Sequence, residues 1–369
     1  MIKLFARLIL KIFPDFISEK IKEEYHQYQR DKSTPNWKRD LSYSTSNNIK
    51  VGFVGAGNYA KHHLDSLKNI KGVEFDCILT NTGRSFEKLR NEYGFKESFT
   101  NIDEFLKRDV DAYFVVSSSD TLFDISKKLF SNKKPVLMEK PPGFTSSQTK
   151  ELLAASEQYE TFGVVALNRR FYSDIQNGLA MLADYGPIRG AILEVPENIS
   201  TVRNNNDLKK IEYENYFFRN SIHGFDTLRH IMGEVVKLKS LGFSNSENNN
   251  RGLSAGAVVE HEDKKYSTIT TLWDTNPFYW KIKIIAENGY LEFSEKGGTK
   301  LTDSKLNIYN ISENKVDKVF RKGNYMQTLS FIKAIDNKSY PKFPLCDLKD
   351  AVKTMEFMEK YQNYIKEES

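Results

Sequence analysis

The stretch that decides the fold is Val51-Gly-Phe-Val-Gly55-Ala-Gly57-Asn-Tyr-Ala60, in which a short apolar run leads directly into a glycine turn. A helical pattern through Leu64 and Leu67 follows at once. The two glycines allow a tight turn from strand to helix, and they bring bare backbone close to a bound diphosphate. Amides at the start of the helix then supply donors and a favourable dipole. We therefore expect a dinucleotide to bind Gly55, Ala56, Gly57, Asn58, Tyr59 and Ala60. The alternative is a tight turn in an α/β domain that binds no nucleotide.

Short apolar runs alternate with helical patterns over the next part of the chain. The expected strands are 73–79, 112–116, 135–138 and 163–167, with helices at 85–93, 122–130 and 146–159. Strands that alternate with helices in this way form a parallel sheet with right-handed crossovers. We expect an α/β Rossmann domain over residues 49–167.

The pattern changes after residue 168. A helix at 172–185, a strand near 191–195, a polar loop and a helix near 222–232 come first. Alternating stretches then follow without helices between them, at 236–243, 256–262, 266–273, 280–286, 290–293 and 306–311. Asn288-Gly289 is typical of a tight hairpin, and two helices, 326–336 and 348–364, close the chain. Residues 168–369 are therefore predicted to form an α+β domain with a mainly antiparallel open sheet.

The first 48 residues form a separate segment. Apolar residues recur at helical spacing between residues 2 and 16, with basic residues between them, which predicts a short amphipathic helix. Such a helix either lies on an anionic membrane surface or packs on the protein's own body or a second subunit. Residues 2–17 are thus a candidate membrane or partner contact. The polar stretch 27–48 is interpreted as a linker.

Composition excludes several classes of protein. The 369 residues include 54 basic and 49 acidic side chains, dispersed along the chain, whereas a nucleic-acid partner would require a basic stripe. A hydrophobic fraction of 39% suffices for a packed core, and no apolar run is long enough for a transmembrane helix. Cys77 and Cys346 lie far apart without metal-ligating neighbours, so we expect no metal site and a reducing, cytoplasmic location.

The end of the second strand carries no carboxylate. An acidic residue there would bind the ribose 2′-hydroxyl of NAD, but the sequence is Leu79-Thr-Asn-Thr-Gly-Arg84. Thr80 or Arg84 could bind a 2′-phosphate, which favours NADP over NAD; the alternative for Arg84 is a solvated side chain. Ser117 and Ser118, which follow the next strand, are assigned to the cofactor site as well.

A second motif, Met138-Glu139-Lys140-Pro141-Pro142-Gly143, stands at the end of a strand. Ligands of open α/β sheets bind outside the carboxyl ends of the strands, so Glu139 and Lys140 are placed beside the cofactor and substrate. An ammonium group there could stabilise a developing alkoxide.

Together these motifs resemble the glucose–fructose oxidoreductase / inositol dehydrogenase family (Gfo/Idh/MocA). The resemblance extends through Asn168-Arg-Arg-Phe-Tyr172 and Ser221-Ile-His223-Gly-Phe-Asp226, and it covers everything from Ile49 onward. It implies transfer of a hydride between NAD(P) and a hydroxyl or keto carbon of a sugar, polyol or sugar nucleotide. It also implies a second domain that binds substrate and forms a homo-oligomer.

The resemblance assigns roles to individual residues. Lys140 matches the lysine that contacts substrate and nicotinamide ribose, and His223 matches the usual acid/base histidine, whose ordinary pKa near 6.5 suits that task. The alternative for His223 is a helix-start residue bonded to backbone. Asp226 lies on the same helical face, where it could orient the imidazole or cap the local structure.

One position departs from the family. Many members carry aspartate four residues before the histidine, where this chain has Arg219. Either Lys140 and His223 suffice, or Arg219 binds an anionic substrate, or hydride chemistry has been lost and the chain is an inactive sensor or scaffold. A reductase of non-sugar carbonyls or imines is a further reading.

The remaining substrate candidates stand where the chain crosses between domains. Asn168, Arg169, Arg170 and Tyr172 occupy this junction, and the two arginines could bind phosphate or carboxylate, with a structural salt bridge as the alternative. Four aromatic residues near the histidine more often fill a core or interface than stack on a sugar; they are Tyr213, Tyr216, Phe217 and Phe218.

Overall fold

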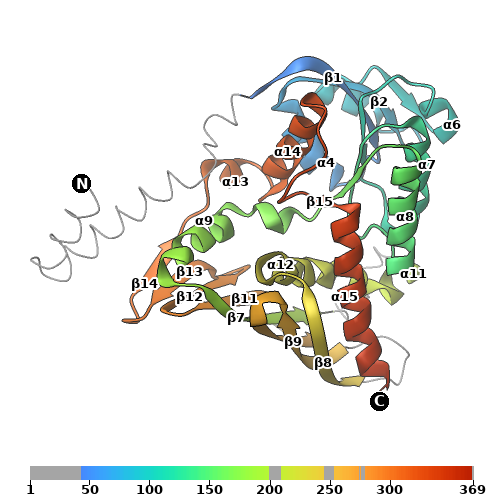
Figure 1. The fold of residues 1–369 in the computed structure, drawn as a ribbon. Helices are drawn as coiled ribbons and strands as arrows, with labels where there is room; N and C mark the ends of the chain where they lie inside the picture. Colours follow the sequence, from blue (N-terminus) through green and yellow to red (C-terminus); the bar gives the residue numbers. More distant parts are fainter. Residues whose placement is uncertain (1–42, 199–208, 245–252, 274, 276–278, 368–369) are drawn as a thin grey trace, which may run out of the picture.

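The computed structural model describes residues 43–198, 209–244, 253–273, 275 and 279–367. Two sheets make up the architecture, one above the other in Figure 1, with helices packed on and between them. The amphipathic helix expected at residues 2–16 lies outside the described residues. No described helix is long and apolar enough to span a bilayer.

The first sheet has seven strands in the order β15-β6-β5-β4-β1-β2-β3. Its strands are β1 (Ser44–Val54), β2 (Lys71–Leu79), β3 (Glu97–Phe99), β4 (Ala112–Val115), β5 (Val136–Met138), β6 (Gly163–Val165) and β15 (Cys346–Asp347). β1 to β6 pair in parallel, and only β15 runs antiparallel to its neighbour. The predicted parallel Rossmann sheet is confirmed.

Alternating side chains of the strands build two cores, one on each face of this sheet. On β4, Phe114 packs with the core beneath α4 (Ala60–Lys68) and α14 (Asn324–Asp336). Val115 packs with the core beneath α7 (Ser119–Leu129) and α8 (Ser146–Gln158). Both faces are covered, which explains why these strands are continuous apolar runs. The shorter helices α5 (Phe86–Tyr93) and α6 (Ile102–Phe105) complete the crossovers.

The second sheet has eight strands in the order β14-β13-β12-β11-β7-β10-β9-β8. They are β7 (Ile188–Glu197), β8 (Val235–Ser244), β9 (Leu253–His261), β10 (Tyr266–Trp273), β11 (Lys281–Ala286), β12 (Gly289–Ser294), β13 (Gly298–Asp303) and β14 (Ile308–Ile311). All neighbours are antiparallel except β7 and β10. The mainly antiparallel sheet is confirmed, and so is a tight hairpin between β11 and β12. Its two loop residues are Glu287 and Asn288, and Gly289 already pairs with Ala286 as the first residue of β12. β13 was not expected, because its sequence GTKLTD is short and polar.

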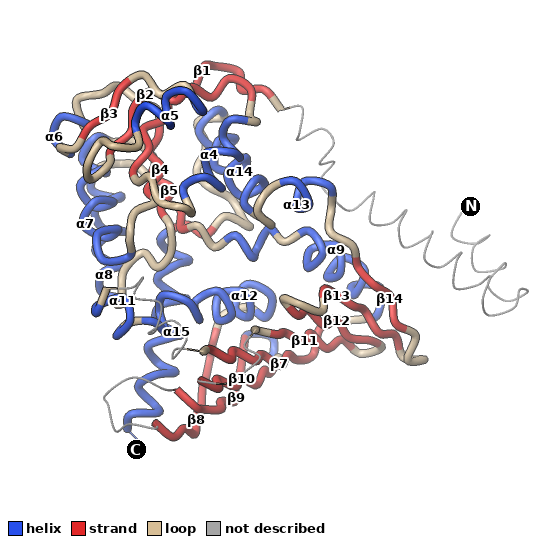
Figure 2. Tube along the Cα trace, turned by 180° about the vertical axis from the view of Figure 1, so that it is seen from behind, coloured by secondary structure: helices blue, strands red, loops and turns tan. Residues whose placement is uncertain are grey.

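Helices cover one face of this second sheet, as Figure 2 shows from behind. They are α9 (Ser173–Leu182), α12 (Ile222–Met232) and α15 (Leu348–Glu367). Among the described residues no element packs on the opposite face, where Ile192, Val258 and Tyr266 are exposed. Short helices α11 (Lys210–Glu214) and α13 (Lys315–Val319) lie in the connections.

The chain ends return to the first sheet. Residues Ser44–Asn48, expected in the linker, form the start of β1, because Asp336 of α14 accepts hydrogen bonds from Tyr43 Oη (2.6 Å) and Ser46 N (2.9 Å). β15 pairs with β6 from the far end of the sequence. Segments beyond residue 167 therefore complete the first layer.

Candidate active site

The glycine turn has the geometry that its sequence requires. The Gly55 amide donates to the Leu79 carbonyl (2.9 Å), and the Gly55 φ of +101° favours glycine. A Cβ at Gly55 would lie 2.1 Å from the Val116 carbonyl oxygen, so no side chain fits there. A Cβ at Gly57 would meet nothing within 4 Å. Gly55 is thus fixed by the fold, whereas Gly57 faces open space.

That open space is a cleft of about 470 Å³ at the start of α4. Within the described chain, the amides of Gly57, Asn58 and Tyr59 donate to no acceptor. Free amides at a helix start beside an open cradle fit a diphosphate. The cleft is lined by Gly57, Asn58, Tyr59, Ala60, Val116, Ser117, Ser118, Ser119, Glu139, Lys140, Glu212 and Arg219.

Most of the sequence-predicted cofactor residues meet in this cleft, but four of them do not line it: Gly55, Ala56, Thr80 and Arg84. The Thr80 hydroxyl accepts the amide of Gly83 (2.9 Å), which closes the turn after β2. Arg84 is exposed on the same turn.

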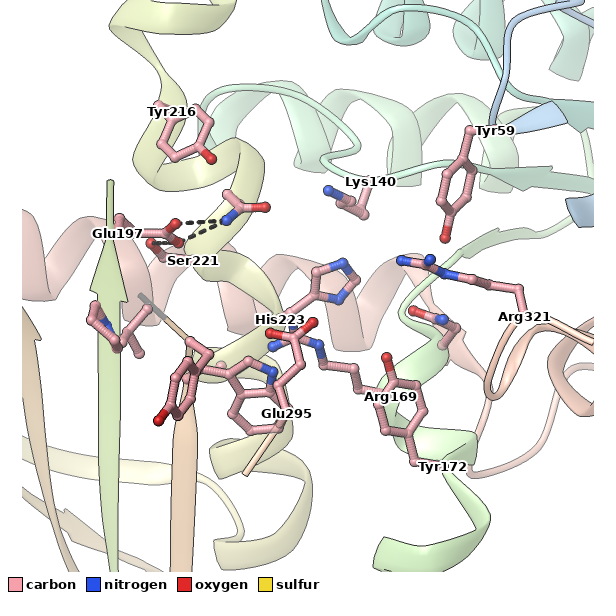
Figure 3. Close-up of a pocket in the computed structure, with 17 residues that line it drawn as sticks. Tyr59, Lys140, Arg169, Tyr172, Glu197, Tyr216, Ser221, His223, Glu295 and Arg321 are labelled. Carbon is pink, nitrogen blue, oxygen red and sulfur yellow. Dashed lines mark hydrogen bonds between the residues drawn. The ribbon is translucent and has the colours of Figure 1, made fainter. Parts of the chain in front are cut away.

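A second cavity of about 320 Å³ adjoins the cleft, and Tyr59 and Lys140 line both (Figure 3). It lies where the two sheets face each other, and residues from both layers enclose it. Its lining is Tyr59, Lys140, Asn168, Arg169, Tyr172, Val195, Pro196, Glu197, Tyr216, Asn220, Ser221, His223, Gly224, Tyr279, Trp280, Glu295 and Arg321.

Lys140 stands at the junction of the two spaces. Its Nζ donates to the carbonyl oxygen of Arg219 (2.9 Å). Burial lowers the pKa of Lys140 to about 8, with nearby Arg219 and Arg169 adding to the effect. The ammonium is therefore mostly protonated at neutral pH and close to releasing its proton.

His223 lies in the first turn of α12, 9% exposed, with its ring toward the centre of the cavity (Figure 3). Its Nδ1 has no hydrogen-bond partner in the described part of the chain. Burial, followed by the positive charges of Arg169, Lys140 and Arg321, lowers the pKa of His223 well below its ordinary value. The imidazole is thus neutral at pH 7 and able to accept a proton.

Glu197, which was not among the predicted site residues, brings a carboxyl group into this cavity. It ends β7, is 4% exposed, and accepts hydrogen bonds from Asn220 Nδ2 (2.8 Å to each oxygen) and Ser221 Oγ (3.2 Å). Burial raises its pKa to about 7, although these donors and nearby Arg169 and Lys140 oppose the rise. The carboxyl group is therefore partly protonated at neutral pH.

The Glu197 pKa makes stability depend on pH. A carboxyl whose pKa is raised from 4.5 to about 7 on folding favours the fold while protonated, and this contribution is lost as the pH rises through about 7. Glu197→Gln cannot ionise, so its unfolding free energy should rise relative to wild type between pH 5 and 8. Urea unfolding at several pH values measures the difference. The exposed pair Lys127–Glu151 supplies the control Glu151→Gln; parallel curves for wild type and Glu197→Gln would refute the assignment.

Arg219 and Asp226 do not line the second cavity. The Arg219 side chain faces the cofactor cleft, where its Nε lies 3.6 Å from Glu212 Oε1. Asp226 accepts Arg170 Nε (2.8 Å) and Nη2 (2.5 Å), and Thr354 Oγ1 (3.0 Å). These donors give Asp226 a place in a buried ion network rather than beside the imidazole.

The junction residues divide between cavity and core. Asn168, Arg169 and Tyr172 line the cavity, and Asn168 Nδ2 donates to the Lys322 carbonyl (2.8 Å). Arg170 is 1% exposed and bonded to Asp226 and Asp350. Arg169 thus faces the cavity, as predicted for a ligand-binding arginine, whereas Arg170 forms the structural salt bridge that was the alternative.

The aromatic residues before His223 mostly fill the core. Phe217 packs against Phe218, Phe225 and Tyr361 at ring distances of 5.3, 5.3 and 6.1 Å. Tyr216, also buried, lines the cavity. These residues lead into a π-helical turn, Phe217–Ser221, which presents the Arg219 carbonyl to Lys140.

A buried pair also supports the second motif. His63 Nε2 and Glu139 Oε1 lie 2.7 Å apart, and His63 is fully buried. His63 had no expected role, because two adjacent histidines on a helix are usually surface residues. The pair anchors the residue before Lys140.

Comparison with known proteins agrees with this architecture. Residues 49–166 match the family model GFO_IDH_MocA, described as an oxidoreductase family with an NAD-binding Rossmann fold. The uncharacterized oxidoreductase YrbE of Bacillus subtilis is 26% identical over 51% of this chain and 55% of its own length. Myo-inositol 2-dehydrogenase of Thermotoga maritima is 22% identical over 51% of this chain and 56% of its own. The chain therefore spans about half the length of these curated relatives.

Solved structures share the complete fold. Levoglucosan dehydrogenase in complex with NADH and L-sorbose superposes with a TM-score of 0.74 at 12% identity, covering 88% of this chain and 98% of that one. UDP-N-acetylglucosamine 3-dehydrogenase from Acidithiobacillus ferrooxidans gives 0.69 at 15% identity, covering 87% and 98%. These likenesses confirm the fold class expected from the sequence, a Rossmann sheet combined with a second, mainly antiparallel sheet.

Proposed function

Since residues 49–166 form the NAD-binding Rossmann domain of the Gfo/Idh/MocA oxidoreductase family, we propose that this chain transfers a hydride between a nicotinamide dinucleotide and a hydroxyl or keto carbon of a sugar, polyol or sugar derivative. Its relatives and structural neighbours include inositol and UDP-sugar dehydrogenases, which supports this reaction class.

One observation carries the proposal: the diphosphate cradle and the cavity around His223 adjoin, and Lys140 and Tyr59 line both. A dinucleotide that binds the glycine turn and extends along the cleft would bring its far end to Lys140. A substrate in the second cavity would lie beside that end and against His223. Proximity of this kind supplies much of the rate enhancement in hydride transfer.

The acid/base roles follow from the charge states of the two residues. His223, neutral at pH 7, accepts the hydroxyl proton as the alcohol is oxidised. Lys140 donates a hydrogen bond to the same oxygen and stabilises its developing negative charge. The hydride would be exchanged with the nicotinamide ring of a dinucleotide held by the glycine turn and Lys140. Asn168 and Tyr172 are placed to bind the remaining hydroxyl groups.

The coenzyme is NADP or NAD, with NADP as our preferred assignment. No carboxylate stands at the end of β2 to repel a 2′-phosphate, and Arg84 is exposed there. Neighbouring structures include complexes with NAD+ or NADH. The affinities of this chain for NADPH and NADH are therefore to be compared directly.

The uncovered face of the second sheet is our candidate for contact with a second copy of the chain. Ile192, Val258 and Tyr266 are exposed on it, and apolar side chains gathered on an open sheet often mark an interface.

Titration of purified protein with NADH and NADPH, followed by nicotinamide fluorescence, tests the coenzyme site. Gly57→Val should fold normally, because a Cβ there meets nothing within 4 Å, yet its side chain would occupy the cradle. Loss of two or more charge-assisted hydrogen bonds, each worth about 1.5–3 kcal/mol, predicts at least about 100-fold weaker binding. Arg84→Ala should weaken NADPH binding more than NADH binding.

The control is Gly256→Ala on β9, where a Cβ comes no nearer than 3.8 Å to a neighbour and no coenzyme contact is expected. If neither coenzyme binds to folded wild type, the proposal fails. Binding without turnover over a panel of sugars, polyols and nucleotide sugars would point to a sensor or scaffold instead.

A further inference from the structure

Two arginines of the second cavity have no acidic partner. Arg169 Cζ lies 4.1 Å from the centre of the Trp280 ring, and Arg321 Cζ lies 5.9 Å from that of Tyr59. Among the described residues, no carboxylate oxygen lies within 4 Å of either guanidinium. The neighbouring Arg170, by contrast, is paired with both Asp226 and Asp350. The cavity thus holds two guanidinium groups whose side-chain partners are the neutral hydroxyls of Tyr172 and Tyr59 rather than carboxylates.

Burial makes the charge of Arg169, which lacks an acidic partner, costly. Desolvation lowers the pKa of Arg169, although nearby Tyr172 and Glu295 oppose the change. The positive charges of Arg169, Lys140 and Arg321 also act on His223, because each of them lowers the pKa of its imidazole. A buried charge that has no acidic partner in the free protein is commonly one that a ligand neutralises.

The carboxyl groups of the cavity do not balance this charge. Both oxygens of Glu197 are occupied by Asn220 and Ser221, and its pKa of about 7 leaves it only partly ionised. Glu295 is exposed at the edge of the cavity. With Lys140, Arg169 and Arg321 on the other side, the lining retains an excess of between one and two positive charges, which suits a monoanion.

We propose that the substrate carries a carboxylate, bound by Arg169 and Arg321, so that the preferred substrates are sugar acids. The Trp280 ring lies beneath the Arg169 guanidinium, with Cζ 4.1 Å from the ring centre. A planar guanidinium fork matches a carboxylate with two parallel hydrogen bonds. A volume of about 320 Å³, at the small end of ligand sites, suits a single sugar unit. This inference rests on the proposed function and names its substrate class.

Binding of the carboxylate would also affect catalysis. It would neutralise part of the positive potential that holds the pKa of His223 low, and so raise the basicity of the imidazole when substrate is present. Neutral sugars would lack this effect.

Calorimetric titration of the full chain with D-glucuronate, D-glucose and D-glucose 6-phosphate, each with and without saturating NADH, tests the inference. We expect glucuronate to bind at least about 10-fold more tightly than glucose, since charge-assisted hydrogen bonds contribute about 1.5–3 kcal/mol. Arg169→Gln should weaken glucuronate binding about 10- to 100-fold, and leave glucose binding within about twofold. Arg169→Lys should recover part of the loss.

Arg321→Gln gives an independent readout, because Arg321 is exposed and its replacement leaves the core intact. It should weaken glucuronate binding in the same direction. Arg189→Gln, a change at an exposed arginine of β7 that lines neither space, is the matched control and should change nothing.

The inference is overturned if glucose binds as tightly as glucuronate, if glucose 6-phosphate binds better than glucuronate, or if none of the three binds. It is equally overturned if both arginine variants keep the wild-type preference. NADH binding is measured separately on the same samples. Its absence would defeat the proposed function, while the titrations without NADH would still report the preference for carboxylate.

Discussion

Replacement of His223 by alanine is expected to lower kcat by about 10²- to 10⁴-fold, the range typical of a lost general acid/base. Its ring points into the cavity, and its Nδ1 has no other partner in the described chain. Lys140→Met, which keeps the length of the side chain without the charge, is expected to lower kcat/KM by a similar factor. His223→Ala should retain coenzyme binding, because His223 does not line the coenzyme cleft, whereas Lys140 lines it and its replacement should weaken coenzyme binding as well.

The pH dependence separates the two roles. The Lys140 ammonium is the required donor and its pKa is about 8, so kcat/KM for oxidation should fall as the pH rises through about 8. This limb should be absent in Lys140→Met. Steady-state kinetics from pH 6 to 10 with a substrate identified from the panel give the profile.

His230→Ala is the matched control for these measurements. His230 stacks on Phe343 at 4.6 Å and lines neither the coenzyme cleft nor the second cavity. Full turnover in both His223→Ala and Lys140→Met would show that the reacting groups lie elsewhere.

Asp226→Ala is expected to destabilise the fold by about 3–5 kcal/mol. Asp226 and Arg170 are each 1% exposed, and the carboxylate accepts two hydrogen bonds from the guanidinium. Removal of the carboxylate leaves the buried Arg170 guanidinium with Asp350 as its remaining acidic partner and with two donors unpaired. Denaturant unfolding, monitored by circular dichroism, measures the loss.

A double variant distinguishes charge from packing. Arg170→Met with Asp226→Leu removes both charges and replaces them with apolar volume, so it should be much less destabilised than Asp226→Ala alone. Lys127→Ala, which breaks an exposed pair with Glu151, should change stability by less than about 1 kcal/mol. A loss of that small size in Asp226→Ala would mean that the buried network contributes little.

The fold could be predicted because its determinants are local. The strand–glycine–helix succession at 51–67 and the alternation of short apolar runs with helices depend only on residues close in sequence. The hairpin between β11 and β12 has the same property. β13 was missed because its sequence is short and polar, although its partners β12 and β14 lie close in sequence. β15 was missed because its partner, β6, lies about 180 residues away in the chain.

The residues of the candidate site also fall into two groups, those marked by a local sequence motif and those that only tertiary packing brings to the cavity. Lys140 and His223 were selected because each lies in a motif with a recognisable sequence, and the structure places both around one cavity. Glu197 and Arg321 were missed because nothing beside them in the sequence marks them. They reach the cavity only because the second sheet and the segment before α14 pack against the first domain.

By itself, the sequence determined the Rossmann domain, the mainly antiparallel second sheet and the motifs on which a coenzyme-dependent reaction is proposed. Only the tertiary structure decided which of two adjacent arginines is buried in an ion network and which faces the cavity. It also decided that Asp226 serves the core and that a carboxyl group enters the cavity on β7. The physical reason is that hydrogen bonding and turns act between near neighbours, whereas the burial of a charge depends on what the rest of the chain packs around it.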